Sequence, residues 1–79
     1  MQLSQAAINQ KVKIIKISGD KEIRRRLLDM GLTKSEIIFI KKIAPLGDPI
    51  EINVRGYELS LRKEDAQNII VESVEETHA

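Results

Sequence analysis

The sequence predicts a mainly β fold, a small closed or nearly closed barrel of about five strands with one or two short helices. Short apolar stretches alternate with polar residues at the period of β-strands, and glycine or proline turns separate them. A chain of 79 residues supports one hydrophobic core, and closure protects the strand edges of so small a sheet. Because the chain has no cysteine, packing must hold the fold without disulfides. We expect a single domain at residues 1–75 and a flexible tail at residues 76–79.

The first elements are a short turn and a strand. Ser4 is a plausible N-cap for a turn through residues 5–7. At residues 11–17, lysines are interleaved with β-branched residues, a pattern typical of a half-buried strand. The apolar residues change face after Ile14, so this strand must contain a bulge or be buried on both sides.

The clearest helix follows, with Asp20 as its N-cap and apolar residues at helical spacing as far as Met30. Gly31 is expected to end it in the left-handed conformation that glycine adopts easily. In that kind of helix end, Leu32 contacts Leu27.

The middle of the chain reads as a strand, a loop and a hairpin. Residues 36–43 are apolar enough to be a strand buried on both faces over its middle. Two prolines and a glycine make residues 44–49 a loop. Residues 50–61 alternate in polarity on both sides of Arg55 and Gly56, which predicts a β-hairpin with a tight turn and positive φ at Gly56.

The end of the domain is expected to hold one helical turn at residues 63–68 and a last strand at residues 69–74. Residues 63–68 contain good helix formers, and β-branched and other apolar residues begin the stretch that follows.

Composition argues against several classes of function. Thirteen Lys and Arg offset twelve Asp and Glu, and the net charge of +1 gives no overall field that would demand nucleic acid or anionic lipid. The two aromatic residues are too few for a platform on which several bases stack. The longest apolar run, residues 37–40, is far shorter than a membrane helix, so we expect the chain not to span a membrane.

Catalysis and metal binding are not expected either. The residues provide neither a Ser-His-Asp set nor a phosphate loop of the GxxxxGK[ST] kind, so we expect no enzyme activity and no cofactor. His78 is the sole histidine, and one imidazole near the end of the chain cannot make the mixed His and carboxylate site that ferrous iron prefers. Asp48, between a glycine and a proline, is expected to accept a hydrogen bond from its own backbone two residues on.

Lys21, Arg24, Arg25 and Arg26 form a basic concentration on the predicted helix. Consecutive helical residues point in different directions, so the three arginines cannot all face one ligand. The simpler interpretation is a solvated face on which Glu22 and Asp29 pair with the arginines, and a patch that contacts a partner or phosphates stays open.

Three apolar residues do not fit the predicted core, namely Leu46 in the loop and Leu28 and Met30 near the end of the helix. If they cluster, they would form an exposed apolar patch of the kind that marks a protein interface. The candidate partner-binding residues are therefore Leu28, Met30, Pro45, Leu46, Gly47 and Asp48.

Three segments together resemble the FeoA family of small SH3-like barrels. They are RLLDMGL at residues 26–32, APLGDPI at residues 44–50 and RGYELSLR at residues 55–62. The chain departs from the family pattern at residues 33–35, where Lys34 and Ser35 replace a usual Pro-Gly pair, and at Gln10, where a glycine is common.

This resemblance implies an accessory protein of bacterial ferrous-iron uptake that resides in the cytosol and docks on the cytosolic G-protein region of the FeoB transporter. It implies no catalysis. Recruitment to the inner face of the membrane by that partner and weak self-association stay open. The alternative is a nucleic-acid-binding or repressor-associated SH3-like barrel, which the near-neutral charge disfavours.

Overall fold

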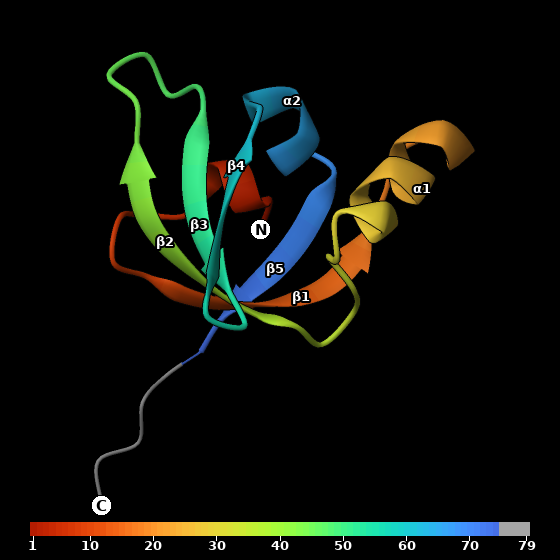
Figure 1. Cartoon of the computed structure of the whole chain (residues 1–79), viewed down its shortest axis with the longest axis horizontal. Coiled ribbons are helices and arrows are strands. Elements are labelled where there is room, and N and C mark those ends of the chain that lie inside the picture. The colour runs from red at the N-terminus through yellow and green to blue at the C-terminus, as the bar shows by residue number, and fades with distance from the viewer. Residues whose placement is uncertain (75–79) are drawn as a thin grey trace, which may run out of the picture.

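A computed structural model describes residues 1–74 of the chain. The predicted tail, with His78, lies outside the described residues. Five strands and two helices follow a short 3-10 turn at Leu3–Gln5 (Figure 1). The elements are β1 (Lys11–Ile17), α1 (Lys21–Asp29), β2 (Ile37–Ile43), β3 (Ile50–Val54), β4 (Tyr57–Leu61), α2 (Lys63–Ala66) and β5 (Ile69–Ser73).

The five strands form one antiparallel sheet in the order β4-β3-β2-β1-β5. Figure 1 shows this sheet coiled around the interior, with α1 projecting to one side and α2 bridging the two edge strands β4 and β5. The predicted mainly β barrel of about five strands is confirmed. Strands β4 and β5 are the two edges of the sheet and do not pair with each other, so the barrel is not fully closed. At the outer edge of β5, Gln2 forms an isolated antiparallel bridge with Ile70.

The core consists of side chains from the inner face of the sheet and from the segments that cover its ends. Leu3 from the 3-10 turn, Leu27 from α1 and Ala66 from α2 join it. From the strands, the buried residues are Val12, Ile14, Ile38, Ile40, Ile50, Ile52, Val54, Leu61, Ile69 and Val71.

The predicted irregularity in β1 is a bulge, because its pairing with β5 shifts register between Ile14 and Lys16. The prediction that the middle of β2 is buried on both faces holds only in part, because Phe39 on the outer face is partly buried. Ile38 and Ile40 are fully buried, whereas Ile37 is 42% exposed, since the coiled sheet has a single face toward the core. A second register shift interrupts β2 after Ile40.

Helix starts depend on local caps, and one of the two predicted caps is wrong. The carboxylate of Asp20 accepts a hydrogen bond from the Ile23 amide at 2.9 Å, as an N-cap does. The first turn, however, begins two residues earlier than expected, at Leu3, and Gln2 rather than Ser4 flanks it.

The end of α1 follows the prediction in detail. The Gly31 amide donates to the Leu28 carbonyl at 2.9 Å, and the Leu32 amide donates to the Leu27 carbonyl at 3.1 Å. These are the two hydrogen bonds of a Schellman motif. Gly31 has φ +91°, and Leu27 and Leu32 are both fully buried in the core.

The β3–β4 turn is also as predicted. Val54 pairs with Tyr57 across a two-residue turn, in which Arg55 has φ +50° and Gly56 has φ +86°. Two successive left-handed residues make the tight turn whose twist suits a β-hairpin.

Candidate docking surfaces

The β2–β3 loop, residues 44–49, presents Leu46 to solvent with 92% of its surface exposed. Two backbone hydrogen bonds hold the base of this loop. The Ala44 amide donates to the Pro49 carbonyl at 3.1 Å, and the Gly47 amide donates to the Ala44 carbonyl at 2.7 Å. The loop is therefore fixed at its base while its apolar side chain stays uncovered.

Asp48 does not cap its own turn, so that prediction is wrong. Its carboxylate accepts a hydrogen bond from the Lys63 amide at 3.0 Å, at the first residue of α2. That amide needs a partner because Arg62, which flanks the helix, forms no side-chain cap. Asp48 thus fastens the β2–β3 loop to α2.

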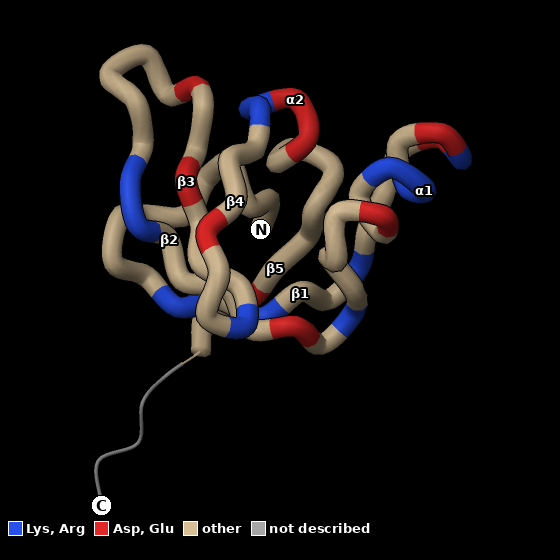
Figure 2. The backbone as a smooth tube through the Cα atoms, viewed as in Figure 1, with Lys and Arg blue, Asp and Glu red and all other residues tan. Residues whose placement is uncertain are grey.

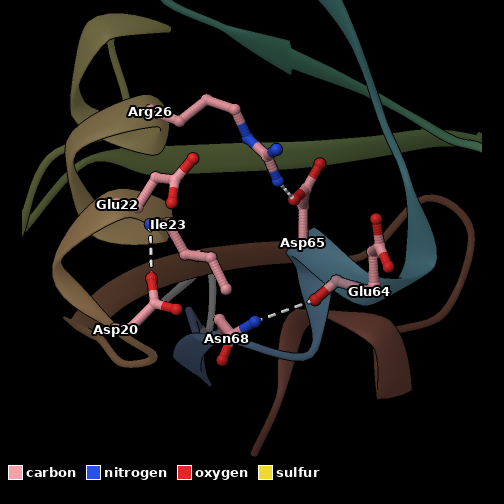
Figure 3. A pocket seen from close by; sticks show the side chains of 7 residues that line it. All are labelled: Asp20, Glu22, Ile23, Arg26, Glu64, Asp65 and Asn68. Carbon is pink, nitrogen blue, oxygen red and sulfur yellow. Dashed lines mark hydrogen bonds and ion pairs between the residues drawn. The ribbon is translucent and has the colours of Figure 1, made fainter.

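The three consecutive arginines of α1 point to two different places, as helical geometry requires. Arg26 turns toward α2 and forms an ion pair with Asp65, which is only 6% exposed (Figure 3). Lys21, Arg24 and Arg25 instead line a hollow of about 470 Å³ together with Leu28.

The expected pairing of these arginines with Glu22 and Asp29 is wrong. No ion pair joins them within residues 1–74, and the partner of Arg26 comes from another element. The physical reason is that Asp65 is nearly buried and its charge is costly there without a cation.

Figure 3 shows the acidic pocket between α1 and α2, which holds about 270 Å³. Several of its polar groups are engaged in structural contacts, namely the Asp20 cap, the Arg26–Asp65 ion pair and a 2.9 Å hydrogen bond from the Asn68 side-chain amide to the Glu64 carbonyl. Among the described residues, no group of three or more His, Cys, Asp or Glu side chains could hold a metal ion. The contacts in this pocket connect α1 with α2.

The candidate partner-binding residues lie on two separate surfaces. The loop that carries Leu46 stands at one side of the molecule, and α1 with Leu28 projects from the other (Figure 1). Leu28 is 51% exposed, whereas Met30 is partly buried and packs against the core.

A contact between the hairpin turn and the end of α1 was not predicted. Arg55 donates to the Gly31 carbonyl at 3.2 Å, and the Tyr57 hydroxyl donates to the Met30 carbonyl at 3.2 Å. Arg55 also lies 3.1 Å from a carboxylate oxygen of Glu36. Its hydrogen bond with Tyr57 and the charge of Glu36 raise the pKa of Arg55. The guanidinium places a positive charge beside the C-terminal end of α1, where the helix dipole favours a cation.

Across β2 and β4, Lys41 and Glu58 form an exposed ion pair. Their hydrogen bond raises the pKa of Lys41 and lowers the pKa of Glu58. Within residues 1–74, neither helix is long and apolar enough to cross a membrane.

The segment at residues 55–62 contacts both of the others, since Arg55 reaches the end of α1 and Leu61 pairs with Ile50. The helix end touches the hairpin turn, and the β2–β3 loop is tied to α2, which directly follows the hairpin. A sequence model of the FeoA domain matches residues 1–73 of the chain. The chain belongs to the FeoA family.

Two relatives show how close the match is. The FeoA-like protein of Clostridium acetobutylicum has a solved structure that is 43% identical, with a TM-score of 0.89, over 100% of this chain and 92% of that one. The Fe(2+) transport protein A/Fe(2+) transporter FeoB fusion protein of Porphyromonas gingivalis is 35% identical over 74 residues. That match covers 94% of this FeoA chain but only 9% of the fusion protein.

More distant structures show the fold alone. The Stenotrophomonas maltophilia FeoA, described as a prokaryotic SH3 domain protein, is 24% identical with a TM-score of 0.77. The match covers 91% of this chain and 89% of that one. A manganese-dependent transcriptional repressor is 20% identical with a TM-score of 0.87, over 94% of this chain and 36% of the repressor. The SH3-like fold is therefore shared with repressors as well as with FeoA proteins.

The two departures from the family pattern lie where hydrogen bonds hold the backbone. Ser35 has φ +74°, a left-handed conformation that glycine reaches more easily, and its amide donates to the Ile14 carbonyl at 2.8 Å. The Gln10 side chain accepts a hydrogen bond from the Ala7 amide at 2.9 Å and donates to the Ser73 hydroxyl at 2.6 Å. In this FeoA protein, side-chain contacts therefore fix the entry to β1.

Proposed function

We propose that this FeoA protein is a non-enzymatic accessory protein of ferrous-iron uptake, which docks on the cytosolic region of a FeoB transporter. The Porphyromonas gingivalis fusion protein carries the proposal, because its name joins the two proteins in a single chain. Two domains held in one chain experience a high effective concentration of each other, which favours direct contact. The proposal places the protein in the cytosol, at the inner face of the membrane when it is docked.

The β2–β3 loop is the proposed contact with FeoB. Leu46 is an apolar side chain with 92% exposure on a loop whose base is hydrogen-bonded. A loop held in shape before binding loses less conformational entropy on docking than a flexible one. Asp48 adds to this order by its hydrogen bond to α2.

Leu46→Asp tests the proposal. Because Leu46 is almost fully exposed, we expect the stability of the fold to change by less than about 0.5 kcal/mol. Loss of an apolar anchor should weaken FeoB binding by about 30-fold or more. The measurement is an NMR titration of labelled protein with the cytosolic domain of FeoB, with and without nucleotide, beside iron uptake in cells that lack their own FeoA.

Two further variants control the experiment. Leu46→Asn removes the apolar contact without adding a charge, and Ile8→Asp alters another exposed apolar residue, 50% exposed, outside the loop. If Leu46→Asp folds, binds FeoB and supports uptake like the parent protein, the docking surface is not this loop. If the parent protein shows no shifts with FeoB in either nucleotide state, the docking proposal itself fails.

A further inference from the structure

Beside α1, the structure holds a second surface that differs from the β2–β3 loop in charge and shape. The hollow of about 470 Å³ on α1 continues into one of about 430 Å³ against β1, because Arg24 and Leu28 line both. We call the two together the α1–β1 groove. It is lined by Ile15, Lys16, Ile17, Lys21, Arg24, Arg25, Leu28 and Lys34.

The groove concentrates positive charge that the rest of the chain lacks. Five of its lining residues are Lys or Arg and none is acidic. The chain has thirteen Lys and Arg, so the remaining eight are outnumbered by twelve Asp and Glu. Blue segments along α1 mark part of this region in Figure 2. The net charge of the whole chain is therefore near zero although the groove is strongly basic.

Within residues 1–74, the groove cations lack the ion-pair partners that several other cations have. Arg26 pairs with Asp65, Lys41 with Glu58 and Arg55 with Glu36. Across the described residues 1–74, none of the five groove cations forms an ion pair. Their charges are thus available to an acidic ligand.

Apolar side chains line the groove together with these cations. Leu28 is 51% exposed, and the bulge after Ile14 places Ile15 among the residues that line the groove instead of in the core. A ligand that paired only with the cations would leave these apolar side chains exposed to water. An apolar group on the ligand would cover them and add to binding.

We propose that the α1–β1 groove binds an acidic peptide segment of a partner protein, with an apolar side chain on Leu28 and its carboxylates on the surrounding cations. The mixed lining of cations and apolar side chains favours a peptide, which can present carboxylates and an apolar side chain together. Neither aromatic residue of the chain lines the groove, so it offers no ring on which a nucleic-acid base could stack. This proposal does not depend on FeoB docking through Leu46.

The test is an NMR titration of the full labelled chain with synthetic acidic peptides. Three eight-residue peptides of glutamate carry two leucines at different spacings, and matched peptides replace every glutamate by glutamine or every leucine by alanine. We expect the largest shifts in α1 and β1, with weaker binding of both matched sets. Because ion pairs contribute, affinity should fall as salt rises, and the contact with Leu28 should remain.

Single substitutions locate the site. Arg24→Gln and Leu28→Ala should each weaken binding of the best peptide by about fivefold or more. Lys42→Gln, an exposed cation outside the groove, should change it by less than about twofold. All three positions are exposed, and thermal melts verify that each variant is folded.

Several results would overturn the proposal. If no acidic peptide causes a shift at about 1 mM, the dissociation constant is larger than about 1 mM and the groove is not a specific peptide site. Shifts outside α1 and β1, or equal loss in Lys42→Gln, would place the site elsewhere. Tighter binding to oligothymidylate or to vesicles containing phosphatidylserine would assign the groove to nucleic acid or to membrane instead.

Discussion

Replacing Gly31 with alanine should destabilise the fold by about 2–5 kcal/mol. A left-handed φ of +91° costs a residue with a side chain about 1–2 kcal/mol. In addition, a Cβ at this position would lie 2.6 Å from the Tyr57 hydroxyl and 2.9 Å from Arg55 Nη2. Both groups donate to carbonyls at the end of α1, and each hydrogen bond contributes about 0.5–1.5 kcal/mol.

Gly47→Ala is the matched control for this substitution. Gly47 has φ +82°, but nothing lies within 4 Å of the position its Cβ would take. This substitution therefore introduces the same kind of backbone strain without a clash between the new Cβ and neighbouring atoms. The difference in unfolding free energy between the two variants isolates the contact of the helix end with the hairpin turn.

Urea denaturation followed by far-ultraviolet circular dichroism measures both variants. Combining Gly31→Ala with Tyr57→Phe removes the hydroxyl that the new methyl group meets, so the two losses should be non-additive by about 1 kcal/mol. Equal destabilisation by Gly31→Ala and Gly47→Ala would refute the argument, because the contact would then contribute nothing beyond strain.

Three further predictions concern the hairpin turn, the α2 cap and the exposed ion pair. Gly56→Val should cost more than about 1 kcal/mol, because a β-branched residue resists the φ of +86°, and an unchanged melting temperature would contradict this. Asp48→Ala should cost about 1 kcal/mol and speed hydrogen exchange at the Lys63 amide, whereas unchanged exchange would show that the cap is unimportant. The hydrogen bond from Lys41 lowers the pKa of Glu58 below 4.5. The ion pair therefore stabilises the fold above pH 4.5, and this stabilisation is lost as the pH falls through the lowered pKa of the folded state. NMR titration should show the Glu58 pKa returning toward 4.5 in Lys41→Met, and no change would exclude the pair as its cause.

Local signals in the sequence were enough to predict most of the fold. The Asp20 cap, the Gly31 ending and the turn at Arg55 and Gly56 each depend on a few neighbouring residues. Alternating polarity fixed the inner face of most strands, since one side of the sheet meets the core. It failed in part for β2, where Ile37 is apolar and yet exposed, because apolar residues also occur on protein surfaces.

Contacts between distant residues were the part that local patterns could not provide. Asp48 caps a helix fifteen residues away in sequence, and Arg26 pairs with Asp65 at a separation of thirty-nine. The α1–β1 groove likewise requires the helix to lie beside β1. Two signals did point to it, namely the basic run on α1 and the apolar residue at position 15 that did not fit the strand pattern.

The small size of α2 makes it a natural reporter of its surroundings. A helix of four residues is too short to persist in water by itself, because helix nucleation costs more than one turn returns. Its survival depends on Asp48 from the β2–β3 loop and on Arg26 from α1. Exchange of its backbone amides would therefore report a disturbance of the β2–β3 loop, which holds Asp48, or of α1, which holds Arg26.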